Sequence, residues 1–163
     1  MSDWIWGADI GLESTAICAL RRGADPQLIA PRAGKGTIPE RLDRLMADTE
    51  LLAGQLCSEC PPLMVLVERP TGKFPNPHLG YATAAVILAL HRALKDRFPY
   101  PVSVVLVTIG DWKKVVLGKG NATKDEVMEW AVQSYPHLDG ITQDEADATA
   151  IASYGLESVG APS

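Results

Sequence analysis

The sequence has no long hydrophobic run: no apolar stretch approaches the ~20 residues of a membrane-spanning helix. Its first residues, 1–4, lack the basic and apolar segments of a secretory signal. Internal repeats and low-complexity segments are absent as well. We therefore expect a soluble protein of the cytoplasm that has no membrane partner.

Cysteine is scarce, with three residues in the chain: Cys18, Cys57 and Cys60. The spacing of Cys57 and Cys60 occurs in zinc knuckles, but no second Cys or His pair stands at a matching interval. We therefore predict ordinary reduced thiols in a reducing compartment.

Charge of one sign is not in large excess, since 15 basic residues face 20 acidic residues and the net charge is −5. Taken alone, this balance disfavours a nucleic-acid partner. The argument weakens if acids share a metal site, because neutralising four carboxylates changes −5 to −1. The distribution of charge decides the partner.

The length of 163 residues, 47% of them hydrophobic, predicts a single domain over residues 1–163 with a substantial core.

Hydrophobic spacing predicts one α/β sheet with mixed strand directions and helices on its faces. The predicted elements are strands over 4–9, 14–20 and 27–30, a helix over 38–56, a strand over 63–67, a helix over 79–98, a strand over 101–107, and helices beginning near 123 and 142. The continuously apolar strands 63–67 and 101–107 are typical of strands buried on both faces. Helix 79–98 is apolar all round, so either the core encloses it or a second subunit covers it. The chain is expected to fray from Gly155 onward.

The last predicted helix carries two acids that its start does not explain. Thr142 and Glu145 form a capping-box pattern, whereas Asp144 and Asp147 share another face of the helix. The positions three, four and seven residues after Asp147, expected to pack inward, are Ala150, Ile151 and Tyr154. A buried Asp147 needs a partner, and from this helix alone a Lys or Arg is a slightly better interpretation than a metal. Asp144 also suits the helix dipole.

Two further acids, Asp9 and Glu68, each end an apolar strand. Singly, Asp9 is explained by a hairpin turn and Glu68 by a pair with Arg69. If the strands are parallel neighbours, both carboxylates emerge at the rim where α/β sheets bind ligands. The last helix would bring Asp144 and Asp147 there as well. Four crowded acids repel one another unless divalent cations bind them, and two Mg²⁺ ions ~4 Å apart catalyse phosphodiester cleavage in proteins.

Lysines supply the second part of the predicted site. Lys113, Lys119 and Lys124 flank a Gly-bearing loop that leads into a helix N-terminus, where an anion is favoured. A solvated surface loop is the alternative, and it is preferred for Lys119. For Lys113 and Lys124 we predict phosphate contact, because cations at a helix start are unfavourable without an anion.

Four motifs resemble the RuvC family of Holliday-junction resolvases, which are nucleases of the RNase H-like superfamily. They are Ala8-Asp9-Ile10-Gly11, Val65-Leu66-Val67-Glu68, residues 112–127 with the sequence WKKVVLGKGNATKDEV, and residues 144–152 with the sequence DEADATAIA. In order and spacing they span nearly the whole chain, and the third is most similar to compact bacteriophage resolvases. The last two motifs are specific. The Asp-x-Gly start is weak, because actin-like ATPases share it.

The resemblance implies an RNase H-like fold: a five-stranded mixed sheet, with three antiparallel strands and then two parallel ones, flanked by helices. It implies that Asp9, Glu68, Asp144 and Asp147 are catalytic and hold two Mg²⁺ ions, with Mn²⁺ as a substitute. Lys113 and Lys124 would contact the scissile strand of four-way or branched DNA. It also implies a homodimer that nicks opposing strands symmetrically, in the host cytoplasm if a phage encodes it.

The loop after Glu68 departs from the family pattern. Cellular RuvC proteins place an aromatic wedge soon after this Glu, whereas here Thr71 stands near that place and Phe74 comes later. Phe74 is equally well interpreted as a base-stacking residue or as an anchor of the loop on the core. Arg69, Lys73 and Phe74 are the further candidate DNA contacts.

Three other functions compete with a junction resolvase. One is an RNase H-like nuclease that acts on RNA or on other branched DNA, which the segment from Lys113 to Lys124 disfavours. Another is an actin-like nucleotide-binding module, suggested by Asp9-Ile10-Gly11, although a second phosphate-binding hairpin is not found. A catalytically silent DNA-binding protein is disfavoured because all four expected acids are present.

Overall fold

The structure is a computed structural model that describes residues 3–70 and 76–160. Its elements are β1 (Trp4–Ile10), β2 (Thr15–Leu20), β3 (Gln27–Ile29), α1 (Ile38–Glu59), β4 (Pro62–Glu68), α2 (Pro77–Leu94), β5 (Ser103–Val107), α3 (Ile109–Leu117), α4 (Lys124–Ser134), the short 3₁₀ helix η1 (Pro136–Leu138) and α5 (Gln143–Gly160). Within these ranges, no helix has the length and hydropathy that crossing a membrane requires.

The five strands form one mixed sheet in the order β3-β2-β1-β4-β5. β1 pairs antiparallel with β2, which pairs antiparallel with β3, whereas β4 runs parallel to both β1 and β5. The predicted fold class is therefore confirmed: three antiparallel strands are followed by two parallel ones. β1 lies in the centre, so its side chains are covered on both faces.

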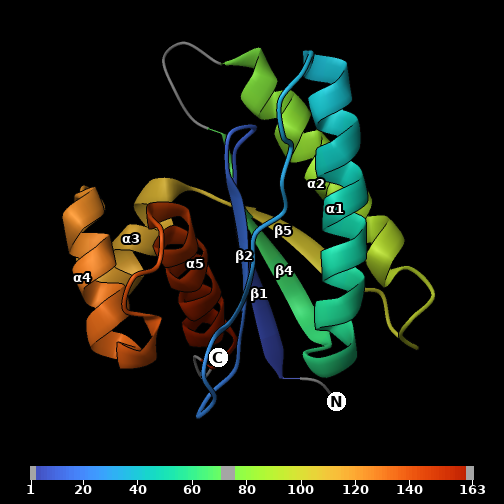
Figure 1. The fold of residues 1–163 in the computed structure, drawn as a ribbon. Helices are drawn as coiled ribbons and strands as arrows, with labels where there is room; N and C mark the ends of the chain where they lie inside the picture. Colours follow the sequence, from blue (N-terminus) through green and yellow to red (C-terminus); the bar gives the residue numbers. More distant parts are fainter. Residues whose placement is uncertain (1–2, 71–75, 161–163) are drawn as a thin grey trace.

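Helices cover both faces of the sheet, with α1 and α2 on one side and α3, α4 and α5 on the other (Figure 1). Because successive side chains of a strand point to opposite faces, Trp4, Trp6 and Ala8 of β1 join the core under α1 and α2. Ile5 instead joins the core under α3, α4 and α5, together with Leu66 of β4. By the same alternation, Asp9 and Glu68 project from the face that α5 covers.

Helix α5 lies unusually close to β1 because both contribute small residues at their contact. A Cβ atom on Gly7 would stand 2.3 Å from the backbone nitrogen of Ala152 and 2.4 Å from the carbonyl oxygen of Ala148. Such distances are far below van der Waals contact, so only glycine permits this approach. Gly155 is buried in the same contact, and the helix continues to Gly160. The expected fraying from Gly155 onward is therefore wrong, since Gly155 packs on the sheet.

Two other expectations about the second half of the chain are corrected. Of the two strands predicted to be buried on both faces, the one expected over 101–107 is β5, which forms an edge of the sheet and leaves Val105 40% and Leu106 52% exposed. An apolar run does not distinguish an edge strand from a central one. The helix predicted over 79–98 begins earlier, after the Asn76 cap, and ends at Leu94; Asp96 then adopts a positive φ of 60°.

Candidate active site

Two of the predicted acids, Asp9 and Glu68, lie side by side at the carboxyl ends of neighbouring parallel strands. The register pairs Ala8 of β1 with Val67 of β4, so the next residue of each strand is the acid. Asp9 is therefore the penultimate residue of a central strand and does not occupy a hairpin turn. Both carboxylates project from the face of the sheet on which α5 packs.

The first turns of α5 bring Asp144 and Asp147 to the same end of the sheet. The helix start is held by the predicted capping box, in which the backbone nitrogen of Thr142 donates to Glu145 Oε2 at 2.7 Å and Glu145 N donates to Thr142 Oγ1 at 3.3 Å. Asp144 lies near enough to Asp9 to raise the pKa of that carboxyl group. Asp147 accepts a hydrogen bond of 3.0 Å from Gln143 Nε2. Of the predicted inward stripe, Ala150 and Ile151 are fully buried, whereas Tyr154 is only partly buried against the same core.

The pKa values of Asp9, Glu68 and Asp147 are all raised above their ordinary values. The pKa of Asp9 is raised from 3.8 to about 8, first by burial and then by the negative charges of Glu68, Asp147 and Asp144 in that order. Burial also raises the pKa of Glu68, as does Asp147, and burial together with Asp144 raises the pKa of Asp147. Lys113 opposes the shift at Glu68 and at Asp147, and Lys124 opposes it at Asp147. The acids therefore form one electrostatically coupled cluster.

Glu68 is held by a tryptophan that sequence reasoning did not assign. The indole nitrogen of the fully buried Trp112, in α3, donates to Glu68 Oε2 at 2.8 Å. Among the ion pairs between described residues, none joins Glu68 to Arg69, so the alternative explanation of Glu68 is not observed. A buried indole N–H needs an acceptor. A tryptophan placed directly before two lysines was the available signal, but its acceptor is 44 residues away in the sequence.

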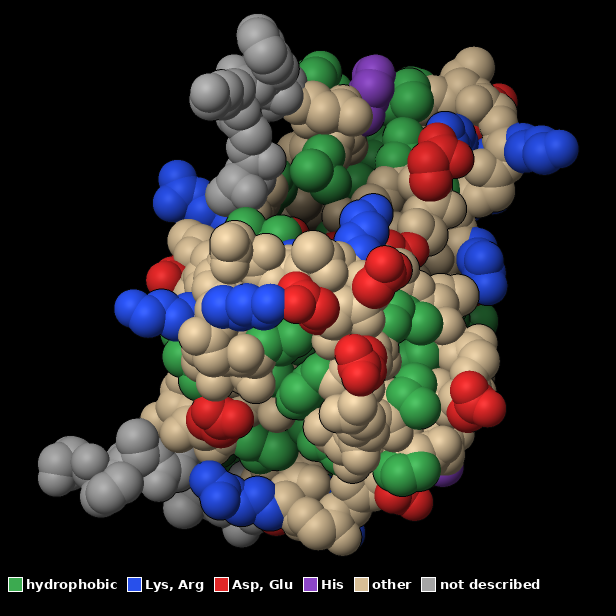
Figure 2. Space-filling model, turned by 90° about the vertical axis from the view of Figure 1, so that its left-hand side faces the viewer, with side chains coloured by type: hydrophobic (Ala, Val, Ile, Leu, Met, Phe, Trp, Pro, Cys, Tyr) green, Lys and Arg blue, Asp and Glu red, His purple; other side chains and the backbone are tan. Residues whose placement is uncertain are grey.

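The predicted basic residues surround the acids to different degrees. Lys113 Nζ donates to the carbonyl oxygen of Ala122 at 2.7 Å, within electrostatic range of Glu68 and Asp147. Lys124 is the exposed first residue of α4, whereas Lys119 forms an ion pair with Glu126 at the surface. On the face turned to the viewer in Figure 2, acidic and basic side chains are interspersed, without a large patch of one sign.

The loop after β4 contributes Arg69, whose side chain is exposed and whose backbone nitrogen donates to the carbonyl oxygen of Val107 at 2.7 Å. This bond ties the start of the loop to the end of β5. The other two predicted DNA contacts of this loop, Lys73 and Phe74, lie outside the described residues.

The acids match a hard divalent cation in donor chemistry, because all four offer carboxylate oxygens and Mg²⁺ prefers oxygen ligands. Burial is the largest cause of the raised pKa values of Asp9, Glu68 and Asp147, and a bound cation would remove that cost. In this side-chain arrangement, no three acidic, histidine or cysteine groups of the described residues already converge as ligands of one ion. The hydrogen bond from Gln143 Nε2 engages an Asp147 oxygen that a cation would take.

The raised pKa of Asp9 predicts a pH-dependent cost to folding when divalent cations are removed. Between pH 3.8, the ordinary pKa, and about 8, the folded protein retains a proton that the unfolded chain releases, so stability falls as pH rises. Asp9→Asn lacks this loss. In EDTA at pH 8 we expect this variant to be more stable than the wild type by a few kcal/mol, at ~1.4 kcal/mol per pKa unit, and therefore to unfold at a higher temperature. The difference should shrink towards pH 4.

Thermal unfolding followed by circular dichroism in EDTA, at several pH values, measures this difference. Asp43→Asn, which changes an exposed acid on α1, is the control and should leave the melting temperature unchanged. Equal melting temperatures of wild type and Asp9→Asn at pH 8 would show that the carboxyl group carries no such cost.

Comparison with known proteins finds similarity in structure but not in sequence. No protein-family model and no curated protein matches the chain. The structure of RuvC from Thermus thermophilus matches with a TM-score of 0.68 at 21% identity, covering 96% of this chain and 95% of that one. T. thermophilus RuvC in complex with a Holliday junction substrate matches with a TM-score of 0.71 at 21% identity, covering 95% and 94%.

A third solved structure, the yeast mitochondrial Holliday junction resolvase Ydc2, matches with a TM-score of 0.60 at 14% identity and covers 95% of this chain and 78% of that one. All three matches extend over nearly the whole chain, so they include the two strands and the helix that carry the four acids. The chain has the RNase H-like fold of RuvC.

Proposed function

We propose that this chain is a structure-selective DNA endonuclease that resolves Holliday junctions and related branched DNA by hydrolysing phosphodiester bonds. The observation that carries the proposal is the cluster of Asp9, Glu68, Asp144 and Asp147 on a fold shared with RuvC. Residues 1–163 would act as one nuclease domain. A T. thermophilus RuvC structure contains a Holliday junction substrate, which supports this substrate class.

The four acids would hold two Mg²⁺ ions, for which Mn²⁺ would substitute. Two bound ions supply an activated water and stabilise the leaving oxygen. The protein's own contribution is to present the carboxylates in fixed places. Trp112 orients Glu68 through its hydrogen bond, and Gly7 lets α5 approach β1 closely enough to bring Asp144 to Asp9.

Lys113 and Lys124 are proposed to bind phosphates of the scissile strand. Both lie within electrostatic range of Asp147, so a phosphate they contact would lie next to the acids. Lys113 is held by the carbonyl oxygen of Ala122, which aims its ammonium group without neutralising it. Arg69, Lys73 and Phe74 remain proposed DNA contacts of the loop that follows Glu68.

A homodimer is proposed from the outward face of α2. This face exposes Tyr81 (56%) and Leu88 (43%), whereas the opposite face packs Val86 and Leu90 into the core. Exposed large apolar side chains in a row on one helix are typical of an interface between subunits. A two-fold dimer would carry two copies of the acidic cluster, as symmetric nicking of two strands requires.

The proposed activity is tested by cleavage of a synthetic four-way junction in Mg²⁺, in Mn²⁺ and in Ca²⁺, with both cut strands mapped at nucleotide resolution. We expect paired nicks at symmetric positions in Mg²⁺ and Mn²⁺. A nicked fork, a linear duplex and an RNA–DNA hybrid serve as comparison substrates. Faster cleavage of the hybrid than of the junction would support an RNase H-like enzyme of another substrate class. The absence of cleavage of every substrate in both Mg²⁺ and Mn²⁺ would contradict the proposal.

A further inference from the structure

A cleft of about 340 Å³ lies beside the acidic cluster and has no part in the roles assigned so far. Asp9 and Asp144 line one end of it, and the turn between β1 and β2 lines another. The remaining walls come from the N-terminal ends of α1 and α2, which meet near this turn at the top of Figure 1. The cleft is thus on the opposite side of the acids from α3 and α4, which carry Lys113 and Lys124.

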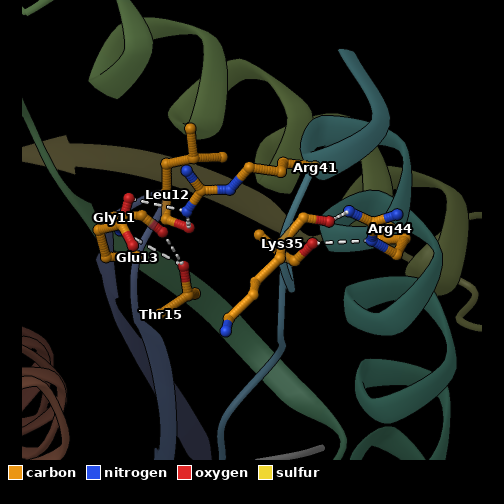
Figure 3. Close-up of polar contacts among 8 residues, drawn as sticks. Gly11, Leu12, Glu13, Thr15, Lys35, Arg41 and Arg44 are labelled. Carbon is orange, nitrogen blue, oxygen red and sulfur yellow. Dashed lines mark hydrogen bonds and ion pairs between the residues drawn. The ribbon is translucent and has the colours of Figure 1, made fainter. Parts of the chain in front are cut away.

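Arg41 places a cation in the wall of this cleft (Figure 3). Its Nη2 donates to the carbonyl oxygen of Leu12 at 3.0 Å and pairs with Glu13 Oε1 at 2.8 Å. Its Nε is buried and has no hydrogen-bond partner among the residues that the structure describes. Arg44, one turn further along α1, instead binds the carbonyl oxygens of Ala33 and Lys35, so it is engaged elsewhere.

The two partners of the Arg41–Glu13 ion pair differ in exposure, which would allow another anion to replace Glu13. The Arg41 side chain is 14% exposed and the Glu13 side chain is 85% exposed. Exposed ion-pair partners contribute little stability, so Glu13 leaves at small cost. Arginine presents a planar fork of donors that matches a phosphate in two hydrogen bonds. The cation would therefore exchange an exposed carboxylate for a phosphate held by the rest of a DNA strand.

The other walls of the cleft suit the remainder of a nucleotide. Ile38 and Leu79 provide apolar surface, and His78 and Asn76 provide polar groups at the start of α2. Pockets of ~300–1,000 Å³ with apolar walls and a few polar groups are typical of small-molecule binding, and this cleft lies at the lower end. A single nucleotide joined to the scissile phosphate at the acids would extend along it.

We propose that this cleft binds the nucleotide adjacent to the scissile phosphate, with Arg41 contacting a backbone phosphate that displaces Glu13. The inference rests on the proposed function, because it assigns a part of the same DNA strand. Lys113 and Lys124 would hold the strand on the α3–α4 side of the acids, and Arg41 would hold it on the α1–α2 side. Glu13 covers the arginine while DNA is absent.

The salt dependence of junction binding tests the role of Arg41. Affinity is measured by fluorescence anisotropy in Ca²⁺ at several salt concentrations for wild type, Arg41→Gln and the control Arg22→Gln, which lies at the far end of the sheet. Arg41→Gln should bind about tenfold more weakly, the scale of a lost charged hydrogen bond. The slope of log affinity against log salt should also become shallower by about 1. Arg22→Gln should change neither.

The variant Glu13→Gln distinguishes the displacement of Glu13 from Arg41 by a phosphate from a simple repulsion between Glu13 and DNA. If Glu13 occupies Arg41, this variant should bind the junction about two- to threefold more tightly, and the gain should vanish in the double variant Glu13→Gln/Arg41→Gln. An equal gain in both backgrounds would overturn the displacement, because it would show only the loss of a negative charge near DNA.

Single neutral methylphosphonate linkages, placed in turn on either side of the mapped cut, locate the contact. One linkage next to the cut should weaken the binding of the wild type and leave Arg41→Gln unaffected. If Arg41→Gln unfolds at a lower temperature but keeps the wild-type salt slope and methylphosphonate profile, then Arg41 only clamps the β1–β2 turn and the inference is wrong. If the wild type neither binds nor cuts the junction, the proposed function itself fails.

Discussion

Replacing Asp147 with asparagine is expected to abolish junction cleavage while junction binding survives. Asparagine has nearly the same shape, and its carbonyl oxygen can still accept the hydrogen bond from Gln143 Nε2, so the start of α5 should keep its structure. What disappears is the negative charge that a divalent cation requires. Removing one electrostatic group from a preorganised site lowers kcat by about 10²–10³-fold, and loss of an anionic metal ligand should reach at least that scale.

Single-turnover cleavage of the junction and anisotropy in Ca²⁺ measure the two properties separately. The control is Asp125→Asn, which removes an exposed acid from the first turn of α4 and should retain wild-type cleavage. Asp147 carries a raised pKa because it is buried, so its neutral replacement should also keep or increase stability in EDTA. Cleavage by Asp147→Asn at the wild-type rate would remove this residue, and with it the four-acid site, from the mechanism.

Gly7→Ala is expected to have the largest effect on stability and to reduce cleavage without touching any acid. The added Cβ would stand 2.3 Å from Ala152 N and 2.4 Å from Ala148 O, both backbone atoms of α5. Backbone atoms of a packed helix cannot rotate away, so α5 must shift on the sheet. Overpacking of this kind costs about 1–3 kcal/mol, and often more when backbone must move. The shift would also carry Asp144 and Asp147 away from Asp9.

A displacement of about 1 Å at a catalytic centre costs about 10²-fold in rate, so cleavage by folded Gly7→Ala should fall by that amount. Gly155→Ala is the matched control in the same helix–sheet contact. Its Cβ meets side-chain atoms and no backbone: Leu66 Cδ1 at 2.2 Å, Ile5 Cγ2 at 2.5 Å and Leu66 Cγ at 3.6 Å. The leucine can change rotamer and the isoleucine must shift slightly, which disturbs the position of α5 less than a clash with its own backbone. Alanine is also the better helix residue, which offsets part of the strain.

Denaturant unfolding and single-turnover cleavage, both at a temperature where each variant is folded, provide the comparison. Gly7→Ala should lose more stability and more activity than Gly155→Ala. Equal stability losses with unimpaired cleavage in both variants would show that the approach of α5 to β1 does not position the acids.

Local chemistry determined much of this protein before any tertiary contact was known. Capping pairs such as Thr142 and Glu145 mark helix starts through atoms three residues apart, and the structure contains those hydrogen bonds. Apolar runs that end in Asp9 and Glu68 mark strand ends, because strand length and turn residues are local properties. The order of these elements was sufficient to predict a mixed five-stranded sheet. The roles of the four acids remain predictions for the experiments above.

Several features of the candidate site depend on partners that are remote in sequence. The indole of Trp112 reaches Glu68 across 44 positions, and Arg41 reaches Leu12 across 29. β5 has the composition of a buried strand but lies at an edge, where Leu106 is exposed. Gly7 gave no signal in its own strand, since its importance comes from the backbone of α5.

One physical reason separates the features that the sequence predicts from those that only the tertiary structure decides. Helix caps, strand lengths and turns are decided by interactions within a few residues, which the order of amino acids states directly. Strand order, the exposure of a sheet edge and the acceptor of a buried indole are decided by which surfaces exclude water together. Only the packed chain contains that information, and in this protein it is what brings acids from β1, β4 and α5 into one cluster.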